Sequence, residues 1–292
     1  MIGGVQIGGS PSPTQDQQPT PEWLEWGGQG PVLHLAHANG FPPGTYRRLA
    51  EALCVSFRVA SLAARPLWDC GAPAGLKSWH TLAEDLSRGL DDRGLSGVVG
   101  VGHSLGAVTT LLAAAVYPQL FSAVVLIDPV MLTGFHTLLW RAMKAVGVRG
   151  MLPIARRARR RRDWWPDHAT VRDSWAAASI FSTWQREVLE DYLRCGVIDA
   201  PQGGVTLRFP KAWEARVFEI APHAVWSELR RVAAPVLFVH GEHTDGFVRA
   251  AARRARHMLG SERVAAVPGT THFVPMERPE ELARVIVERL RD

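Results

Sequence analysis

The chain has 292 residues, of which 47% are hydrophobic, and its formal net charge at pH 7 is +5. This length is enough for one α/β domain with an insertion, and the hydrophobic content argues against a disordered chain. No apolar run approaches the roughly 20 residues that a membrane-spanning helix needs, so we expect no stable membrane insertion.

Residues 1–21 are rich in Gly, Pro, Ser, Thr and Gln. They lack the basic start and the apolar core of a signal peptide, and they predict a flexible tail. The three cysteines, Cys54, Cys70 and Cys195, are odd in number and show no metal-ligand spacing. Because this pattern is typical of reduced thiols, we expect a cytoplasmic protein.

Short apolar runs alternate with amphipathic stretches along most of the chain. The expected strands cover residues 32–36, 57–62, 97–101, 123–127, 235–240 and 263–267. The expected helices cover residues 46–54, 78–92, 107–117 and 279–291. Strands that alternate with helices predict an α/β fold whose mostly parallel central sheet carries helices on both faces.

The alternation stops between residues 131 and 222, where we find no clear buried strand. We predict a mostly helical cap there, inserted into a core formed by residues 22–130 and 223–292. A cap above a catalytic site would use some of its aromatic side chains to line the substrate pocket. Seven of the eleven tryptophans lie in or just after this region: Trp140, Trp164, Trp165, Trp175, Trp184, Trp213 and Trp226.

The positive charge belongs to one segment of the chain. Nine Lys and Arg and no acidic residue lie between Arg141 and Arg162, and without these nine cations the net charge would be −4. The run Arg156 to Arg162 could bind a polyanion or a membrane surface, or it could be a solvated helix face. We favour the solvated face and expect no nucleic-acid partner, because no aromatic groove or nucleic-acid motif accompanies the run.

Residues 102–106 read Gly-His-Ser-Leu-Gly and fit the Gly-x-Ser-x-Gly pattern of a nucleophile elbow. An expected strand precedes them and an expected helix follows. A serine on such a turn has a strained backbone, and the following helix points free N–H groups toward it. The pattern predicts that Ser104 is a nucleophile.

A serine hydroxyl needs a base within hydrogen-bond distance, and the base needs a carboxylate that fixes its tautomer. His272 lies in a loop between a short strand and the last helix, at the carboxyl edge of the sheet, and is the expected base. His103 is interpreted as a structural histidine of the elbow that also borders the substrate. Phe41, Trp140 and Phe273 are the other expected substrate-binding residues.

Two carboxylates follow strands and lie between the serine and the histidine in the chain. Asp245 comes after the expected strand 235–240, and Asp128 ends the strand that follows the elbow helix. Glu242 is a weaker third choice, because it follows its strand too closely. Asp128 would also serve as a turn or helix cap before Pro129.

An acyl-transfer intermediate carries an oxyanion that needs fixed N–H donors. We expect one donor to be the backbone N–H of Leu105, directly after the nucleophile. The second donor should come from the loop after the first expected strand, where Asn39 or Ala38 precedes Gly40.

These motifs together resemble the α/β-hydrolase superfamily from about residue 31 to residue 292. The residues that carry the resemblance are those of the loop 37–42, the elbow 102–106, and the segments 126–129, 239–242 and 269–275. The chain looks like the capped bacterial branch of esterase and lipase-like enzymes. The resemblance implies Ser104 as nucleophile, His272 as base and a cap over the pocket.

The chain departs from the superfamily pattern at the expected acid. Superfamily members usually carry it three residues after the glycine of the His-Gly turn, and this chain has Thr244 there, with Asp245 one place later. Asp128 occupies the position that some branches use instead. We place Asp245 ahead of Asp128.

A serine rather than an aspartate at the elbow argues against epoxide hydrolase and haloalkane dehalogenase chemistry. No metal or phosphate-binding motif is visible, so we expect no cofactor. The expected function is hydrolysis of small to medium, mostly apolar carboxylic esters through an acyl-enzyme. The alternatives are a carbon–carbon bond hydrolase, a cofactor-free haloperoxidase-like enzyme, and a non-catalytic ligand-binding protein.

Overall fold

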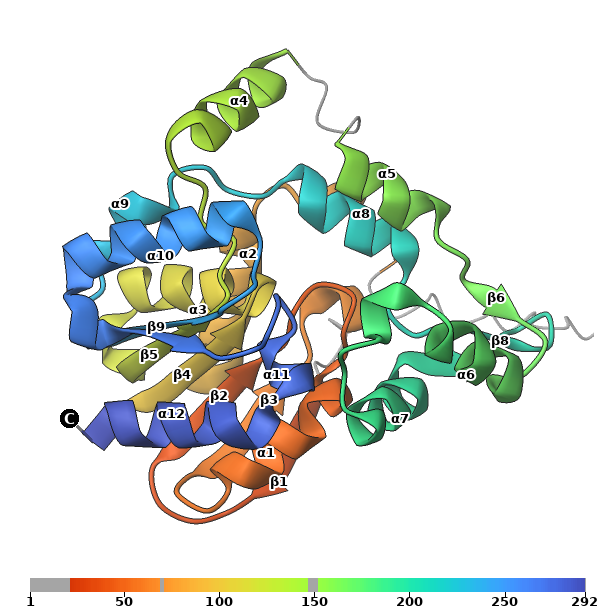
Figure 1. Cartoon of the computed structure of the whole chain (residues 1–292), viewed down its shortest axis with the longest axis horizontal. Coiled ribbons are helices and arrows are strands. Elements are labelled where there is room, and N and C mark those ends of the chain that lie inside the picture. Colours follow the sequence, from red (N-terminus) through yellow and green to blue (C-terminus); the bar gives the residue numbers. More distant parts are fainter. Residues whose placement is uncertain (1–21, 69–70, 147–151, 292) are drawn as a thin grey trace, which may run out of the picture.

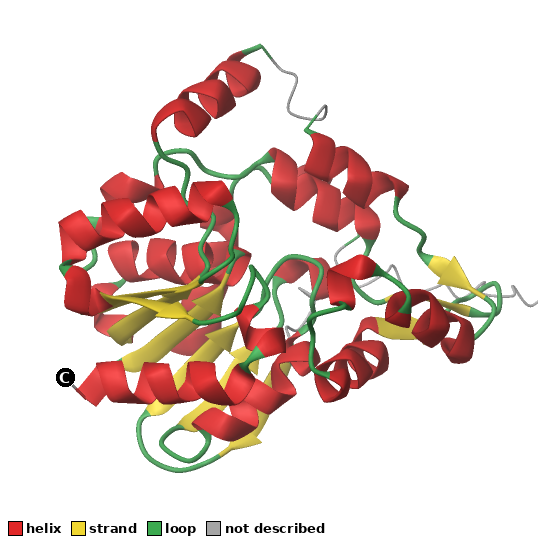
Figure 2. Cartoon of the chain, viewed as in Figure 1, coloured by secondary structure: helices red, strands yellow, loops and turns green. Residues whose placement is uncertain are grey.

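The computed structural model describes residues 22–68, 71–146 and 152–291. Within them, a seven-stranded sheet with the order β1-β3-β2-β4-β5-β9-β10 forms the centre (Figures 1 and 2). The strands are β1 (Trp23–Gly27), β2 (Val32–Ala36), β3 (Arg58–Leu62), β4 (Val98–His103), β5 (Phe121–Ile127), β9 (Val236–Gly241) and β10 (Val264–Val267). The predicted N-terminal tail and Cys70 lie outside the described residues.

Neighbouring strands of this sheet are parallel, except that β1 pairs with β3 in the antiparallel direction. The central strand β4 is buried at every position, and its Val101 lies between Leu35 of β2 and Val125 of β5. A parallel strand that is covered on both faces reads as a continuous apolar run, which is why the sequence identified it. The predicted α/β fold is confirmed.

Helices cover both faces of the sheet (Figure 1). One face carries α2 (Trp79–Asp91), α3 (Leu105–Val116) and α10 (Gly246–Leu259), and the other carries α1 (Arg47–Leu53) and α12 (Pro279–Arg291). The four helices expected from the sequence are present to within a few residues, and the side chain of Ser78 caps the N-terminus of α2. None of the described helices is long and apolar enough to cross a lipid bilayer.

Three elements of the core do not match the prediction: the short helix α11 (Val274–Glu277), the helix α10 and the strand β1. The helix α10 buries mainly alanines, Ala251, Ala252 and Ala255, so its apolar stripe is weak in a sequence full of arginine. The strand β1 is a half-buried edge strand of five residues, too short for a clear alternation.

A long segment separates β5 from β9 and lies beside the sheet in Figure 1. It is mostly helical, as expected, but it also contains a small antiparallel sheet with the order β6-β8-β7, which corrects the expectation of no strand there. These strands have two or three residues each, which leaves no periodic signal to read. The elements are α4 (Gly134–Ala145), α5 (Pro153–Arg160), β6 (Trp164–Trp165), α6 (His168–Ala176), α7 (Arg186–Gly196), β7 (Val197–Asp199), β8 (Val205–Leu207), α8 (Lys211–Glu219) and α9 (Val225–Leu229).

Candidate active site

Ser104 lies on the sharp turn between β4 and α3, with φ of 54° and ψ of −107°. Its backbone N–H donates a hydrogen bond to the carbonyl of Ile127 at the end of β5 (2.9 Å). Ser104 and Asp128 are the two non-glycine residues with positive φ among the described residues. A side chain in this region of backbone space is strained, and such strain is typical of functional sites.

The two glycines of the elbow leave no room for a side chain. A Cβ at Gly102 would lie 2.3 Å from the carbonyl oxygen of Gly106, and one at Gly106 would lie 2.3 Å from the carbonyl oxygen of Ala36. Both neighbours are backbone atoms that cannot rotate away. The Gly-x-Ser-x-Gly spacing therefore follows from how closely α3 approaches β2 and β4.

Three side chains form a continuous hydrogen-bonded chain at the carboxyl ends of the strands. The Oγ of Ser104 lies 3.2 Å from Nε2 of His272, and Nδ1 of His272 lies 2.8 Å from Oδ1 of Asp128. A carboxylate can only accept, so Nδ1 of His272 carries the proton when the ring is neutral. This tautomer leaves Nε2 free to accept the hydroxyl proton of Ser104.

The carboxylate in contact with His272 is Asp128, the alternative acid, and not the preferred Asp245. Asp128 is fully buried and also accepts hydrogen bonds from the backbone N–H of Gly241 (2.8 Å) and the hydroxyl of Thr244 (2.5 Å). Asp245 instead stands at the N-terminus of α10. The sequence could not separate the two, because β5 and β9 are adjacent parallel strands whose carboxyl ends meet at one edge.

Two further observations complete this part of the site. Thr244, which stands where superfamily members usually carry the acid, donates to Asp128 rather than replacing it. The third candidate, Glu242, is exposed and accepts a hydrogen bond from the backbone N–H of Gly269 (2.8 Å), away from the His272 ring.

The pKa of His272 is raised above its ordinary value of 6.5. Burial lowers this pKa, but the hydrogen bond and negative charge of Asp128 outweigh burial, and the more distant charges of Asp245 and Glu277 add to the rise. His103 differs, because burial followed by the nearby His272 holds its pKa well below 6.5. The two rings lie 5.1 Å apart, so a charge on the ring of His272 disfavours a charge on the ring of His103.

His103 is fully buried, and hydrogen bonds occupy both of its ring nitrogens, so its side chain is not exposed for the substrate contact that the sequence predicts. Its Nε2–H donates to the backbone carbonyl of His272 (2.9 Å), and its Nδ1 accepts from the hydroxyl of Tyr46 (2.8 Å). That hydroxyl in turn accepts the backbone N–H of Ala38 (2.9 Å). One buried chain thus connects the loop after β2 to the loop that carries His272. The interpretation of His103 as a structural residue of the elbow agrees with this position.

This buried chain of hydrogen bonds distinguishes Ala38 from Asn39, the two candidates for the second oxyanion donor. The N–H of Ala38 donates to the hydroxyl of Tyr46. The N–H groups of Asn39 and Leu105, in contrast, donate to no acceptor within the described part of the chain. Asn39 and Gly40 form a tight turn in which the N–H of Phe41 donates to the carbonyl of Ala38 (3.3 Å). Gly40 has φ of 86°, which suits glycine at the third position of such a turn.

The segment between β5 and β9 also holds this turn. Nδ2 of Asn39 donates to the backbone carbonyl of Glu214 in α8 (3.0 Å), and the hydroxyl of Tyr192 in α7 donates to the carbonyl of Gly40 (3.2 Å). The turn is therefore fixed from the core on one side and from α7 and α8 on the other.

A cluster of aromatic rings stands beside His272. The rings of Phe41, Trp184 and Phe273 lie 5.4–5.8 Å from one another, and Phe273 lies 5.6 Å from the ring of His272. Phe41 and Phe273 are two of the predicted substrate-binding residues, and the ring of Trp184 packs against both of them. Trp140 is buried in α4, where its indole N–H donates to the carbonyl of Ala221 (2.8 Å).

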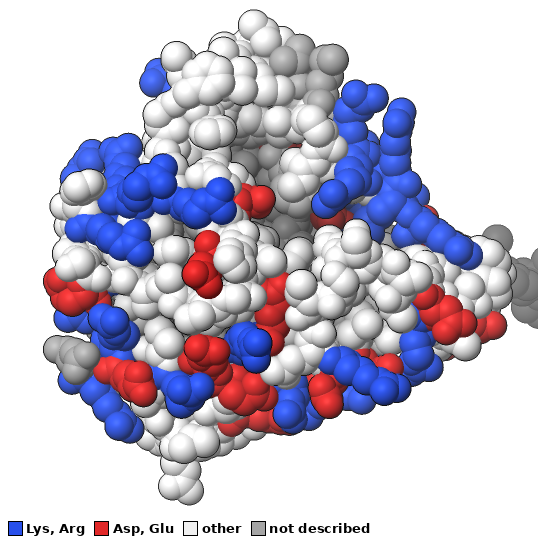
Figure 3. Space-filling view, in the orientation of Figure 1, with Lys and Arg blue, Asp and Glu red and all other residues white. Residues whose placement is uncertain are grey.

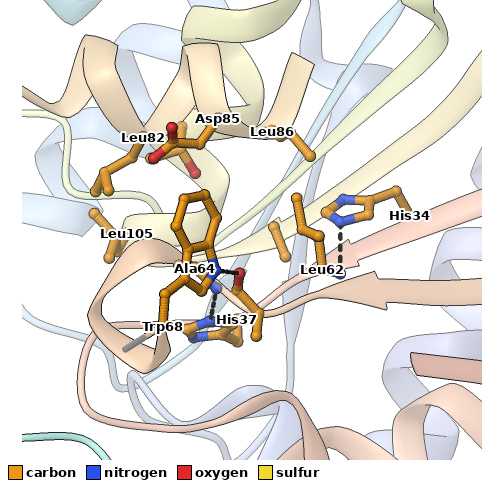
Figure 4. Close-up of a pocket in the computed structure, with 12 residues that line it drawn as sticks. His34, His37, Leu62, Ala64, Trp68, Leu82, Asp85, Leu86 and Leu105 are labelled. Carbon is orange, nitrogen blue, oxygen red and sulfur yellow. Dashed lines mark hydrogen bonds between the residues drawn. The ribbon is translucent and has the colours of Figure 1, made fainter. Parts of the chain in front are cut away.

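A small cavity lies behind the loop after β2 (Figure 4). Its lining includes His34, His37, Trp68, Asp85 and Leu105, and its volume of about 30 Å³ is on the scale of one water molecule. Burial lowers the pKa of His37 to about 4 and that of His34 to about 3, so both rings stay neutral and each accepts a backbone N–H. The cavity is too small to hold an ester.

Comparisons with known proteins identify the family of the chain. A family model described as the alpha/beta hydrolase family matches residues 32–285, and the chain belongs to that family. The abhydrolase domain-containing protein AFT2-1 of Alternaria alternata is 27% identical over 232 residues, which cover 65% of this chain and 82% of that protein.

Solved structures show the same fold. E-2-(acetamidomethylene)succinate hydrolase superposes with a TM-score of 0.75 at 23% identity. The match covers 93% of this chain and 95% of the hydrolase chain. An esterase from Thermogutta terrifontis superposes with a TM-score of 0.65 at 20% identity and covers 93% of both chains.

Substitution of Tyr46 by Phe should destabilise the protein and slow its turnover. The change leaves the Ala38 N–H and the Nδ1 atom of His103 buried without a hydrogen-bond partner, at a cost on the order of 2 kcal/mol. Thermal melting and kcat measured on one preparation would check this. Tyr117→Phe is the control, because the Tyr117 hydroxyl forms no hydrogen bond with any residue that the structure describes. Equal melting temperatures for the two variants would contradict the role of the buried chain.

Proposed function

We propose that this chain is a serine hydrolase that cleaves carboxylic esters of small to medium, mostly apolar substrates. The observation that carries the proposal is the hydrogen-bonded chain from Ser104 through His272 to the buried Asp128. Its order and geometry match what nucleophilic catalysis by a serine requires.

In the proposed reaction, Oγ of Ser104 attacks the ester carbonyl while Nε2 of His272 takes the hydroxyl proton. Asp128 stabilises the imidazolium that forms, and the N–H groups of Leu105 and Asn39 bind the oxyanion of the tetrahedral intermediate. The C–O bond then breaks, and His272 returns the proton to the departing alcohol. A water molecule, deprotonated by His272, releases the acid from the acylated Ser104 by the same steps in reverse.

The surroundings of His272 support an apolar substrate. The partly exposed rings of Phe41 and Phe273 and the ring of Trp184 provide an aromatic surface next to the base. We assign residues 131–222 of the segment between β5 and β9 as the cap, because the hydroxyl of Tyr192 and the carbonyl of Glu214 contact the proposed oxyanion turn. An esterase is among the proteins of similar fold.

Ser104→Ala should abolish ester hydrolysis without unfolding the protein. Removal of the nucleophile lowers turnover by about four to six orders of magnitude. Hydrolysis of nitrophenyl esters of increasing acyl length measures this, and a fluorophosphonate probe should label the parent but not the variant. Ser227→Ala in α9 is the control and should behave like the parent. Near-parental activity of Ser104→Ala would overturn the assignment.

Asp128→Asn should lower kcat on the order of a thousandfold or more, because an amide favours the wrong tautomer of His272. Asp245→Asn should lower it only a few-fold, since its carboxylate acts on His272 through charge alone. Melting curves of both variants must accompany the kinetics, so that unfolding is not mistaken for a catalytic loss. The opposite ranking of two folded variants would move the acid to Asp245.

The value of kcat/KM should fall on the acid side with a midpoint above pH 6.5. His272 must be neutral to accept the serine proton, and its raised pKa means that protonation begins at a higher pH than for a free histidine. Asp245→Asn should move the midpoint to lower pH, because it removes a negative charge that favours the protonated ring. A flat profile between about pH 5 and 8 would exclude His272 as the base.

A further inference from the structure

The helix α4 presents an apolar stripe to solvent. Phe135, Leu138 and Leu139 of α4, and Val146 directly after its last residue, are 72%, 65%, 47% and 69% exposed. Together with exposed Ala142 they follow the spacing i, i+3, i+4, i+7 and i+11, which places them on one side of the helix.

The opposite side of α4 is the one that faces the protein. Trp140 is only 5% exposed, and its indole N–H is bonded to the carbonyl of Ala221. The stripe is therefore not the core-facing side of the helix. A contiguous apolar surface of this kind on a folded chain is typical of an interaction site.

The neighbouring helix α5 presents arginines. It buries Ala155 and Ala158 and exposes Arg156, Arg157 and Arg160, for which the structure gives no ion pair with any described residue. Other arginines of the run are engaged: Arg159 pairs with Glu219 and Arg161 with Glu214.

Both helices lie along the same edge of the molecule. In Figure 1, α4 and α5 stand at the top of the view, and Figure 3 shows basic side chains gathered over α5 beside the pale surface of α4. Ile154, 45% exposed at the start of α5, adds an aliphatic side chain to this edge. We call the stripe of α4 and the three exposed arginines of α5, Arg156, Arg157 and Arg160, the α4–α5 surface.

From this juxtaposition we infer that the α4–α5 surface docks the protein on an anionic lipid membrane. A bilayer surface offers acidic head groups for the arginines and an apolar layer directly beneath them for Phe135, Leu138, Leu139 and Val146. A nucleic acid would use the arginines but leave the aliphatic stripe in water. The structure thus favours the membrane-surface interpretation of the arginine run over the solvated helix face.

Flotation of the full-length protein with lipid vesicles tests the inference. The protein should float with vesicles made of equal parts phosphatidylcholine and phosphatidylglycerol, and much less with phosphatidylcholine alone. Added salt should weaken the binding, because it screens the arginines.

Two triple variants separate charge from apolar contact. Each triple variant should lower the partitioning of the protein onto the mixed vesicles by about tenfold or more. The first is Arg156→Gln/Arg157→Gln/Arg160→Gln, and the second is Phe135→Ser/Leu138→Ser/Val146→Ser. The matched control is Arg88→Gln/Arg284→Gln/Arg291→Gln, which removes three exposed arginines of α2 and α12 that have no ion pair given among the described residues. It should bind like the parent.

The inference is overturned if the parent does not float with the mixed vesicles, or if the serine triple variant floats as well as the parent. It is also overturned if the parent binds an oligonucleotide and not the vesicles. Fluorophosphonate labelling of Ser104 and the melting temperature are measured on every variant. Labelling depends on the proposed catalytic chain and flotation does not, so the two proposals fail separately.

Discussion

The site depends on the adjacency of two parallel strands that each end in a strained residue. Ser104 follows β4 and Asp128 follows β5, both with positive φ, and the N–H of Ser104 is bonded to the carbonyl of Ile127 directly before Asp128. This arrangement fixes the nucleophile and the carboxylate at one edge of the sheet. His272 needs only to reach the space between them from the loop after β10.

Buried neutral groups hold that loop in place. His103 takes part through a single tautomer, because its Nε2 faces a carbonyl and its Nδ1 faces a hydroxyl. The low pKa of His103 also matters, because it keeps this ring neutral. A second cation beside His272 would disfavour the imidazolium that forms in the proposed reaction. The sequence places His103 next to the nucleophile, but only the packing shows that it supports the base from behind.

Much of the core could be predicted from the sequence, because buried parallel strands are continuous apolar runs and the elbow has a strict spacing. The choice between Asp128 and Asp245 could not, since both follow strands that end at the same edge and only the side-chain directions distinguish them. The strands β6, β7 and β8 are too short to show a hydrophobic periodicity. The helix α10 buries mainly alanines, whose weak hydrophobicity gives no clear apolar stripe. The exposed stripe of α4 looks in the sequence like any buried helix face.

The turn at Asn39 and Gly40 is shared between the two parts of the chain. From one side it rests on Tyr46, and from the other it is held by Tyr192 of α7 and the Glu214 carbonyl of α8. Any displacement of α7 and α8 that admits a ligand would also release one of the two supports of this turn. In the proposed reaction, binding of the oxyanion at this turn would therefore require α7 and α8 to be in the positions seen here.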